Sequence, residues 1–292
     1  MAAMPIGVFY VRDIYRVLIL INILAFLVVG VNPGAALARD DSVKGRTLSY
    51  ADVADMVTLS DLVIVARIKK LKGVRSESGK ATEKEKRYLL ANARVDSLIR
   101  GDKGVPPIVD FLAVQNDGTD GSPFRLRKGE KVIIFARNGS KPGEVQLVSR
   151  YSVMPMTEEL DIMSRAIATE AARVGAPPRI LSVGDAFHIA GTIAGEGETQ
   201  IFLKTETGAP VSLSIIHRPG QPARWGVSLG EIIDDTAVPP KRNTLLWYRL
   251  ACGLPDSLPY AATADLAPSD AKAAARDYGF VLESLGSCGR TL

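Results

Sequence analysis

Residues 61–149 repeat one pattern, in which short apolar runs rich in β-branched residues are separated by glycine, asparagine and lysine. Apolar runs bounded by turn residues are typical of β-strands. The pattern predicts strands at residues 61–71, 87–101, 106–114, 130–137 and 144–149. The preceding residues, 50–60, have apolar positions near helical spacing and predict a short helix. We therefore expect the first half of the chain to be a β domain preceded by one helix.

After this domain the apolar residues are spaced as in a helix rather than as in β-strands. Leu160, Ile167 and Val174 belong to a set of apolar residues that recur every three or four positions, so they would form one stripe along a helix. Thr157 stands at the start of this stretch, where a hydroxyl can accept a hydrogen bond from a backbone N–H of the first turn. We expect a helix within residues 156–178 that links the two halves of the chain.

The strand pattern resumes beyond the helix. Strands are predicted at residues 182–195, 199–207, 210–218 and 223–233, and short links between them favour an antiparallel meander. Glu196-Gly197-Glu198 and Gly208-Ala209 are two of these links. An apolar segment at residues 244–253 and a final helix at about residues 269–284 complete the chain.

The N-terminal residues predict export. Arg12 and Arg16 precede an apolar run at residues 17–31, which only one asparagine and one glycine interrupt. Basic residues before a run of this length are typical of a secretory signal peptide, and Ala36 and Ala38 supply the small residues that signal peptidase requires. We predict cleavage after Ala38 and a periplasmic or secreted product. The alternative is an uncleaved anchor in the inner membrane, although a spanning helix needs roughly 20 apolar residues.

Cysteine use agrees with export. Cys252 and Cys288 are the only cysteines in the sequence, and in an oxidising compartment they are expected to form a disulfide. The alternative is a pair of buried free thiols. The formal net charge is +4 and falls to +3 without the first 38 residues, so overall charge indicates no particular partner.

Basic residues nevertheless concentrate between residues 67 and 87, where the local net charge is +6. In an intracellular β domain such a segment would suggest binding to nucleic acid, but export separates the chain from nucleic acid, so we expect no such partner. Anionic lipid or a cell-surface polymer suits the charge better, and a solvated loop without a ligand is the alternative. The candidate binding residues are Lys69, Lys70, Lys72, Arg75, Lys84, Lys86 and Arg87.

Ser228 is the one candidate nucleophile that a motif singles out, because residues 226–230 read Gly-Val-Ser-Leu-Gly, the G-x-S-x-G spacing of many hydrolases. In those enzymes the histidine follows the serine, whereas His188 and His217 both precede it. Apolar residues also alternate with small ones here, which predicts an ordinary strand. We expect no catalytic residues. A serine hydrolase with an unusual triad order, using one of these histidines with Asp185, Asp234 or Asp235, is the alternative.

No metal or other cofactor is expected. Two histidines without a cysteine partner or H-E-x-x-H spacing fall short of a zinc signature. The loop sequence NDGTDG at residues 116–121 lacks the oxygen ligands that a calcium loop places at its third and twelfth positions.

Residues 50–152 resemble the netrin-like module of tissue inhibitors of metalloproteinases and of many exported bacterial proteins. Leu98-Ile99-Arg100-Gly101 stands where that module ends its second strand, and Gly129-Glu130 stands where its fourth strand opens. The resemblance implies a five-stranded OB-type barrel. Inhibitors of that family clamp the target zinc with an N-terminal cysteine, and no cysteine precedes Cys252 here. The resemblance therefore implies the fold without that activity.

These patterns together predict a mainly β protein. Its parts would be a signal peptide at residues 1–38, an OB-like barrel at 45–155, a linking helix at 156–178, and an antiparallel β domain with a C-terminal helical tail at 179–292. The expected function is that of an exported, non-catalytic binding or interaction module in the cell envelope, with an unknown protein or envelope component as its partner.

Overall fold

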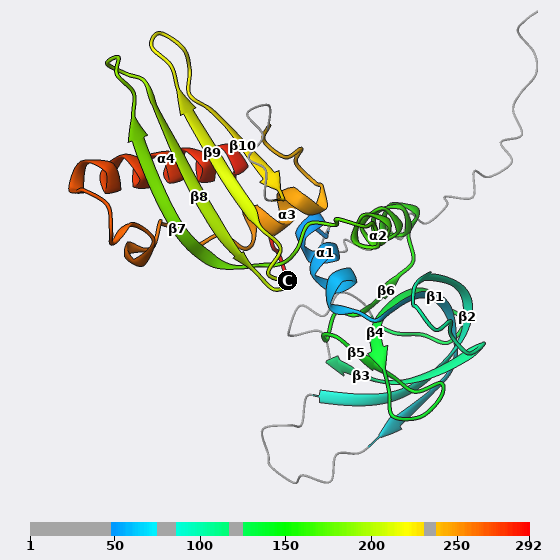
Figure 1. Cartoon of the computed structure of the whole chain (residues 1–292). Coiled ribbons are helices and arrows are strands. Elements are labelled where there is room, and N and C mark those ends of the chain that lie inside the picture. The colour runs from blue at the N-terminus through cyan, green and yellow to red at the C-terminus, as the bar shows by residue number, and fades with distance from the viewer. Residues whose placement is uncertain (1–47, 75–85, 117–124, 231–237) are drawn as a thin grey trace, which may run out of the picture. The chain divides into compact units, whose positions relative to one another are not determined.

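The computed structural model describes residues 48–74, 86–116, 125–230 and 238–292 (Figure 1). These residues belong to one compact unit, residues 45–292. The fold class is mainly β, as the sequence predicts, with two antiparallel sheets and four α-helices among the described residues. The predicted signal peptide lies outside the described residues. Within the described part of the chain, no helix is both long and apolar enough to cross a membrane.

Helix α1 (Tyr50–Leu59) occupies the predicted position. A capping box starts it, because Ser49 Oγ accepts the Asp52 N–H at 3.1 Å and the Asp52 carboxylate accepts the Ser49 N–H at 2.9 Å. This reciprocal pair satisfies two backbone donors that have no partner inside a helix. The apolar side of α1, including Val53 and Val57, is fully buried.

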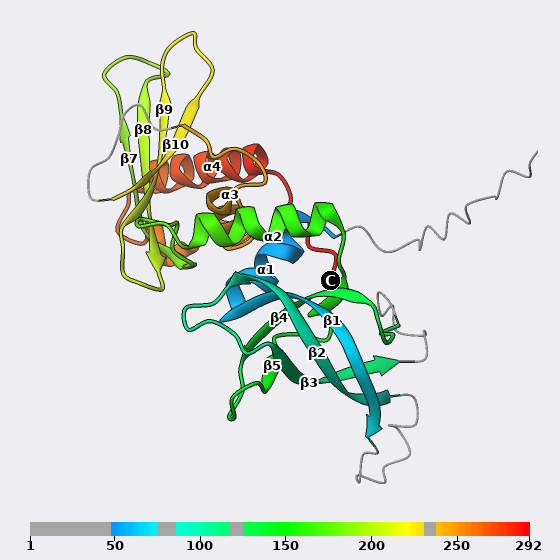
Figure 2. The ribbon, with the colours of Figure 1, turned by 90° about the vertical axis from the view of Figure 1, so that its right-hand side faces the viewer.

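The first sheet contains the five predicted strands in the order β3-β2-β1-β4-β5 (Figure 2). A sixth strand, β6, pairs with β4 and was not predicted, because three residues are too few to show a period. Asp110 and Glu144 form a parallel bridge between β3 and the residue before β5, yet the sheet is not a closed barrel, since β5 is itself only three residues long. The strands are β1 (Leu62–Val74), β2 (Lys86–Arg100), β3 (Ile108–Asn116), β4 (Lys131–Asn138), β5 (Val145–Leu147) and β6 (Val153–Pro155).

Helix α2 (Glu158–Ala171) follows the first sheet and begins where the sequence predicts. Thr157 Oγ1 accepts the Leu160 N–H at 3.2 Å and so caps the helix. Leu160 and Ile167 of the predicted stripe are buried. The helix ends before Val174, which is fully exposed, so the predicted stripe is about one turn too long.

The second sheet is the predicted antiparallel meander, in the order β10-β9-β8-β7, and helix α4 lies along one of its faces (Figure 1). The first link differs from the prediction. Gly191 donates its N–H to Glu196 and Glu196 donates to Ile193, so residues 191–196 form the link and Gly197 belongs to a strand. The elements are β7 (Ile180–Ala190), β8 (Gly197–Thr205), β9 (Val211–His217), β10 (Arg224–Leu229) and α4 (Pro268–Leu285).

The apolar segment at residues 244–253 forms helix α3 (Leu245–Ala251), and a 3-10 turn, η2 (Tyr260–Thr263), precedes α4. Thr244 Oγ1 caps α3 by accepting the Trp247 N–H at 3.3 Å. The buried Trp247 indole donates to the Leu285 carbonyl at 2.9 Å, which joins α3 to the end of α4.

One hydrophobic core contains residues from both halves of the chain, for example Val57 of α1, Phe135 of β4, Ile215 of β9 and Tyr278 of α4. A smaller core packs on one side of the first sheet around Phe111. The division into two domains near residues 156–178 stays a prediction, and the larger core extends across it.

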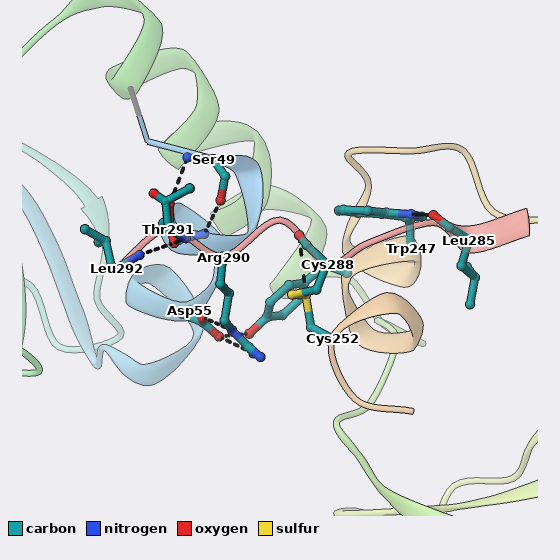
Figure 3. The surroundings of a disulfide bond; sticks show 11 residues. Ser49, Asp55, Trp247, Cys252, Leu285, Cys288, Arg290, Thr291 and Leu292 are labelled. Atoms are coloured by element: carbon teal, nitrogen blue, oxygen red, sulfur yellow. Dashed lines mark hydrogen bonds and ion pairs between the residues drawn. A yellow bond between two sulfur atoms is a disulfide. The ribbon is translucent and has the colours of Figure 1, made fainter. Parts of the chain in front are cut away.

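The segment after α4 returns to α1 (Figure 3). Cys252 and Cys288 form the predicted disulfide. Arg290 then donates two hydrogen bonds to the Asp55 carboxylate, Nε to Oδ2 at 2.6 Å and Nη2 to Oδ1 at 2.9 Å. Thr291 donates its N–H and its hydroxyl to Asp52, at 2.8 and 2.7 Å. The covalent bond thus fixes Cys288 at the end of α3, and the two carboxylates fix residues 290–292 against α1.

Acidification is expected to loosen this attachment. Burial alone raises the pKa of Asp52, but hydrogen bonds from Thr291 and Ser49 lower the pKa more, so it lies below its ordinary value. A carboxyl group with a lower pKa in the folded chain stabilises the fold above its unfolded pKa of about 4, and that contribution is lost as pH falls through the folded pKa. We therefore expect a higher unfolding free energy for wild type than for Asp52→Asn at pH 7, measured by urea denaturation. The difference between the two proteins should be smaller at pH 3. A gap of equal size at both pH values would contradict this prediction. Glu283→Gln, which changes an exposed acid on α4, is the control.

Candidate functional site

Ser228 lies inside strand β10, opposite Ser212 of β9, and its side chain is buried. A nucleophile elbow instead places its serine on a sharp turn between a strand and a helix. The strand interpretation of the G-x-S-x-G sequence is therefore confirmed at Ser228.

Neither histidine is near this serine. His217 ends β9, five positions from Ser212, which corresponds to about 16 Å along a strand. His188 lies on β7, and two strands separate β7 from β10. Activation of a hydroxyl needs a base within about 3 Å, so the register does not support a triad that contains Ser228.

A buried aspartate brings the two histidines together instead. Asp277 of α4 is only 1% exposed and accepts a hydrogen bond from His217 Nε2 at 2.8 Å. The Thr199 hydroxyl donates to the other carboxylate oxygen of Asp277, and His188 Nδ1 is 2.8 Å from the same hydroxyl oxygen. We call these four residues the Asp277 cluster.

The Asp277 cluster joins α4 to three neighbouring strands. The triad alternative named Asp185, Asp234 and Asp235 rather than Asp277; the last two of the three lie outside the described residues. The helical pattern of α4 could have revealed Asp277, because it falls among the buried positions Ala273, Ala274 and Val281. Within the described residues, no three His, Cys, Asp or Glu side chains are grouped so that they could hold a metal ion.

The predicted basic residues are only partly described. Lys69, Lys70 and Lys72 lie on β1 and are exposed. Arg75 and Lys84 lie outside the described residues. The backbone of Lys86 and Arg87 belongs to β2, while their side chains lie outside the described part of the structure.

The strands around these lysines have one face turned away from the core. Ala91 and Phe111 pair across β2 and β3 and are buried, so alternate residues point outward. On this outer face Leu90 pairs with Leu112, and the two are 45% and 51% exposed. We use the name outer patch for seven residues of this face, Lys70, Lys72, Val74, Tyr88, Leu90, Leu112 and Val114. Lys70 pairs with Asn92 of the same face, and Asn92 donates a hydrogen bond to the exposed Asp110 at 2.8 Å.

The outer patch combines exposed apolar side chains with lysines. Its rows follow the register, with Val74, Tyr88 and Val114 in one row and Lys72 beside Leu90 in the next. Exposed apolar residues that gather on one face beside polar residues are found at contacts with proteins or membranes. The sequence analysis found the lysines but missed the apolar residues, because their shared face depends on the pairing of three strands.

Comparison with protein-family models and with curated proteins gives no match for this chain. The resemblance to netrin-like modules therefore stays a prediction. The geometry described above is the basis for assigning a function.

Proposed function

We propose that this chain is an exported, non-catalytic binding protein that attaches to anionic lipid membranes through the outer patch. The observation that carries the proposal is the shared face of the exposed leucines and lysines on β1, β2 and β3. At a bilayer surface the apolar side chains can enter the boundary between headgroups and acyl chains, while the lysine ammonium groups remain among lipid phosphates.

The mixed chemistry of the outer patch favours lipid over a charged polymer. Each lysine near an anionic membrane contributes about 1 kcal/mol, and buried apolar area adds roughly 25 cal/mol per Å². A polyanionic polymer would use Lys70 and Lys72 but would leave Leu90 and Leu112 in water. The positions of Ser228 and of the Asp277 cluster support the non-catalytic part of the proposal, because the serine and the imidazoles are separated.

Removing the apolar part of the outer patch is expected to weaken membrane binding about tenfold or more. The test is sedimentation of wild type and of a Leu90→Ser, Leu112→Ser variant with vesicles of phosphatidylcholine and phosphatidylglycerol. Wild type should bind these anionic vesicles more tightly than pure phosphatidylcholine, and added salt should weaken binding because it screens the lysines. A Lys70→Gln, Lys72→Gln variant should lose most of the salt dependence.

The matched control is Leu181→Ser with Ile189→Ser, two exposed apolar residues of β7 in the second sheet. This variant should bind anionic vesicles as wild type does. Equal binding by the Leu90→Ser, Leu112→Ser variant would contradict the proposal. So would binding that salt does not weaken, or binding to a soluble polyanion without binding to vesicles.

A further inference from the structure

A polar cleft of ≈ 700 Å³ opens beside the disulfide, away from the residues of the outer patch. The end of α1, the end of β4, the start of β7, helix α3 and the segment after α4 all contribute to its lining. Four arginines and three acids line it, so the lining is net basic. They are Arg137, Arg179, Arg249 and Arg290 with Asp55, Asp61 and Glu206.

The four arginines of the cleft differ in whether a carboxylate balances their charge. Arg290 is paired with Asp55 in two hydrogen bonds. Within the part of the chain that the structure describes, Arg137 and Arg249 donate hydrogen bonds only to the backbone carbonyls of Leu59 and Pro177, at 3.2 and 3.4 Å. Among the described residues, neither of these two arginines nor Arg179 forms an ion pair with a carboxylate.

The pKa of Arg249 depends on its burial and on the charged groups around the cleft. Burial has the largest effect on the pKa of Arg249 and lowers it. The charges of Tyr248 and Glu206 raise this pKa, and smaller effects come from Arg179, which lowers it, and Asp55, which raises it. Arg179 and Arg249 line the same cleft, so their like charges repel each other, and an anion bound between them would relieve the repulsion. Arg249 also lies over the Tyr248 ring, 5.4 Å from its centroid, which restricts the orientation of its donors.

We propose that this cleft binds an oxyanion, a phosphate or carboxylate group, between Arg179 and Arg249. Guanidinium groups present paired N–H donors that match the oxygens of both groups. Glu206 and Asp61 in the same lining can accept hydrogen bonds, so they favour a ligand that carries a hydroxyl or amino group beside its anionic group. This site uses residues other than those of the membrane surface proposed above.

Thermal unfolding in the presence of inorganic phosphate, citrate or chloride tests the site. At matched ionic strength, phosphate or citrate should raise the Tm of wild type saturably and chloride should not. Arg179→Gln removes an exposed side chain that makes no hydrogen bond with the described residues, so this variant should fold normally. Its affinity for phosphate or citrate should fall at least tenfold, whereas Arg173→Gln, an exposed arginine after α2, should match wild type.

The two probes separate the possible sources of the anionic group. A response to phosphate alone indicates a phosphate ligand, and a response to citrate alone indicates a carboxylate; either result supports the site. Equal responses of Arg179→Gln and wild type, or equal effects of all three salts, would overturn it. Arg179→Gln should retain vesicle binding, so a failure here is distinct from a failure of the membrane proposal.

Discussion

Replacement of both Cys252 and Cys288 by serine is expected to lower the free energy of unfolding by about 3–4 kcal/mol. The disulfide joins residues 36 positions apart, and the closed loop contains all of α4. The disulfide restricts the conformations of the unfolded chain, and the variant regains this freedom. The folded structure of the variant should change little, because Asp52 and Asp55 still hold residues 290–292. Urea denaturation at pH 7 measures the difference.

Reduction of wild type provides the matched control for this variant. Wild type in excess reductant should unfold at the same urea concentration as the double serine variant, and the variant should not respond to the reductant. A decrease in unfolding free energy below about 1 kcal/mol would contradict the prediction. It would show that the disulfide does little to restrict the unfolded chain.

The regular elements could be predicted because their periods are local. The apolar stripe of α2 and the short link between β8 and β9 involve only neighbouring residues, so the pattern located these elements within a few positions. Strand β6 and helix α3 were missed as elements because a strand of three residues and a helix of seven carry too little periodic signal. The sequence predicted an OB-like barrel, and the structure has the five strands in a sheet that does not close. Closure depends on the length over which β5 pairs with its neighbours, and the apolar pattern contains no information on that length.

Sequence patterns predicted less of the two candidate sites than of the fold. The lysines of the outer patch follow from charge counting, whereas their alignment with Leu90 and Leu112 requires the register of three strands. The arginine cleft brings together residues from positions 137, 179 and 249, whose proximity depends on how the two sheets and α3 pack. Sequence patterns describe neighbours along the chain, and these sites are made by neighbours in space.

Replacement of Asp277 by alanine is expected to lower the free energy of unfolding by about 3 kcal/mol. The change removes the acceptor of two hydrogen bonds, one from the His217 ring and one from the fully buried Thr199 hydroxyl. His217 is 28% exposed and can turn to water, whereas the buried Thr199 hydroxyl would keep only His188 Nδ1, 2.8 Å away, as a partner. Since these bonds attach α4 to β8 and β9, the cost should appear in global unfolding by urea.

The comparison variants separate this effect from a general weakening of α4. Glu283→Ala changes an exposed acid on the same helix and should shift the unfolding free energy by less than about 0.5 kcal/mol. Thr199→Val removes the hydroxyl donor, so combining it with Asp277→Ala should cost less than the sum of the two single changes. Additive costs would mean that Asp277 stabilises α4 without depending on Thr199, and the Asp277 cluster would then not act as one hydrogen-bonded unit.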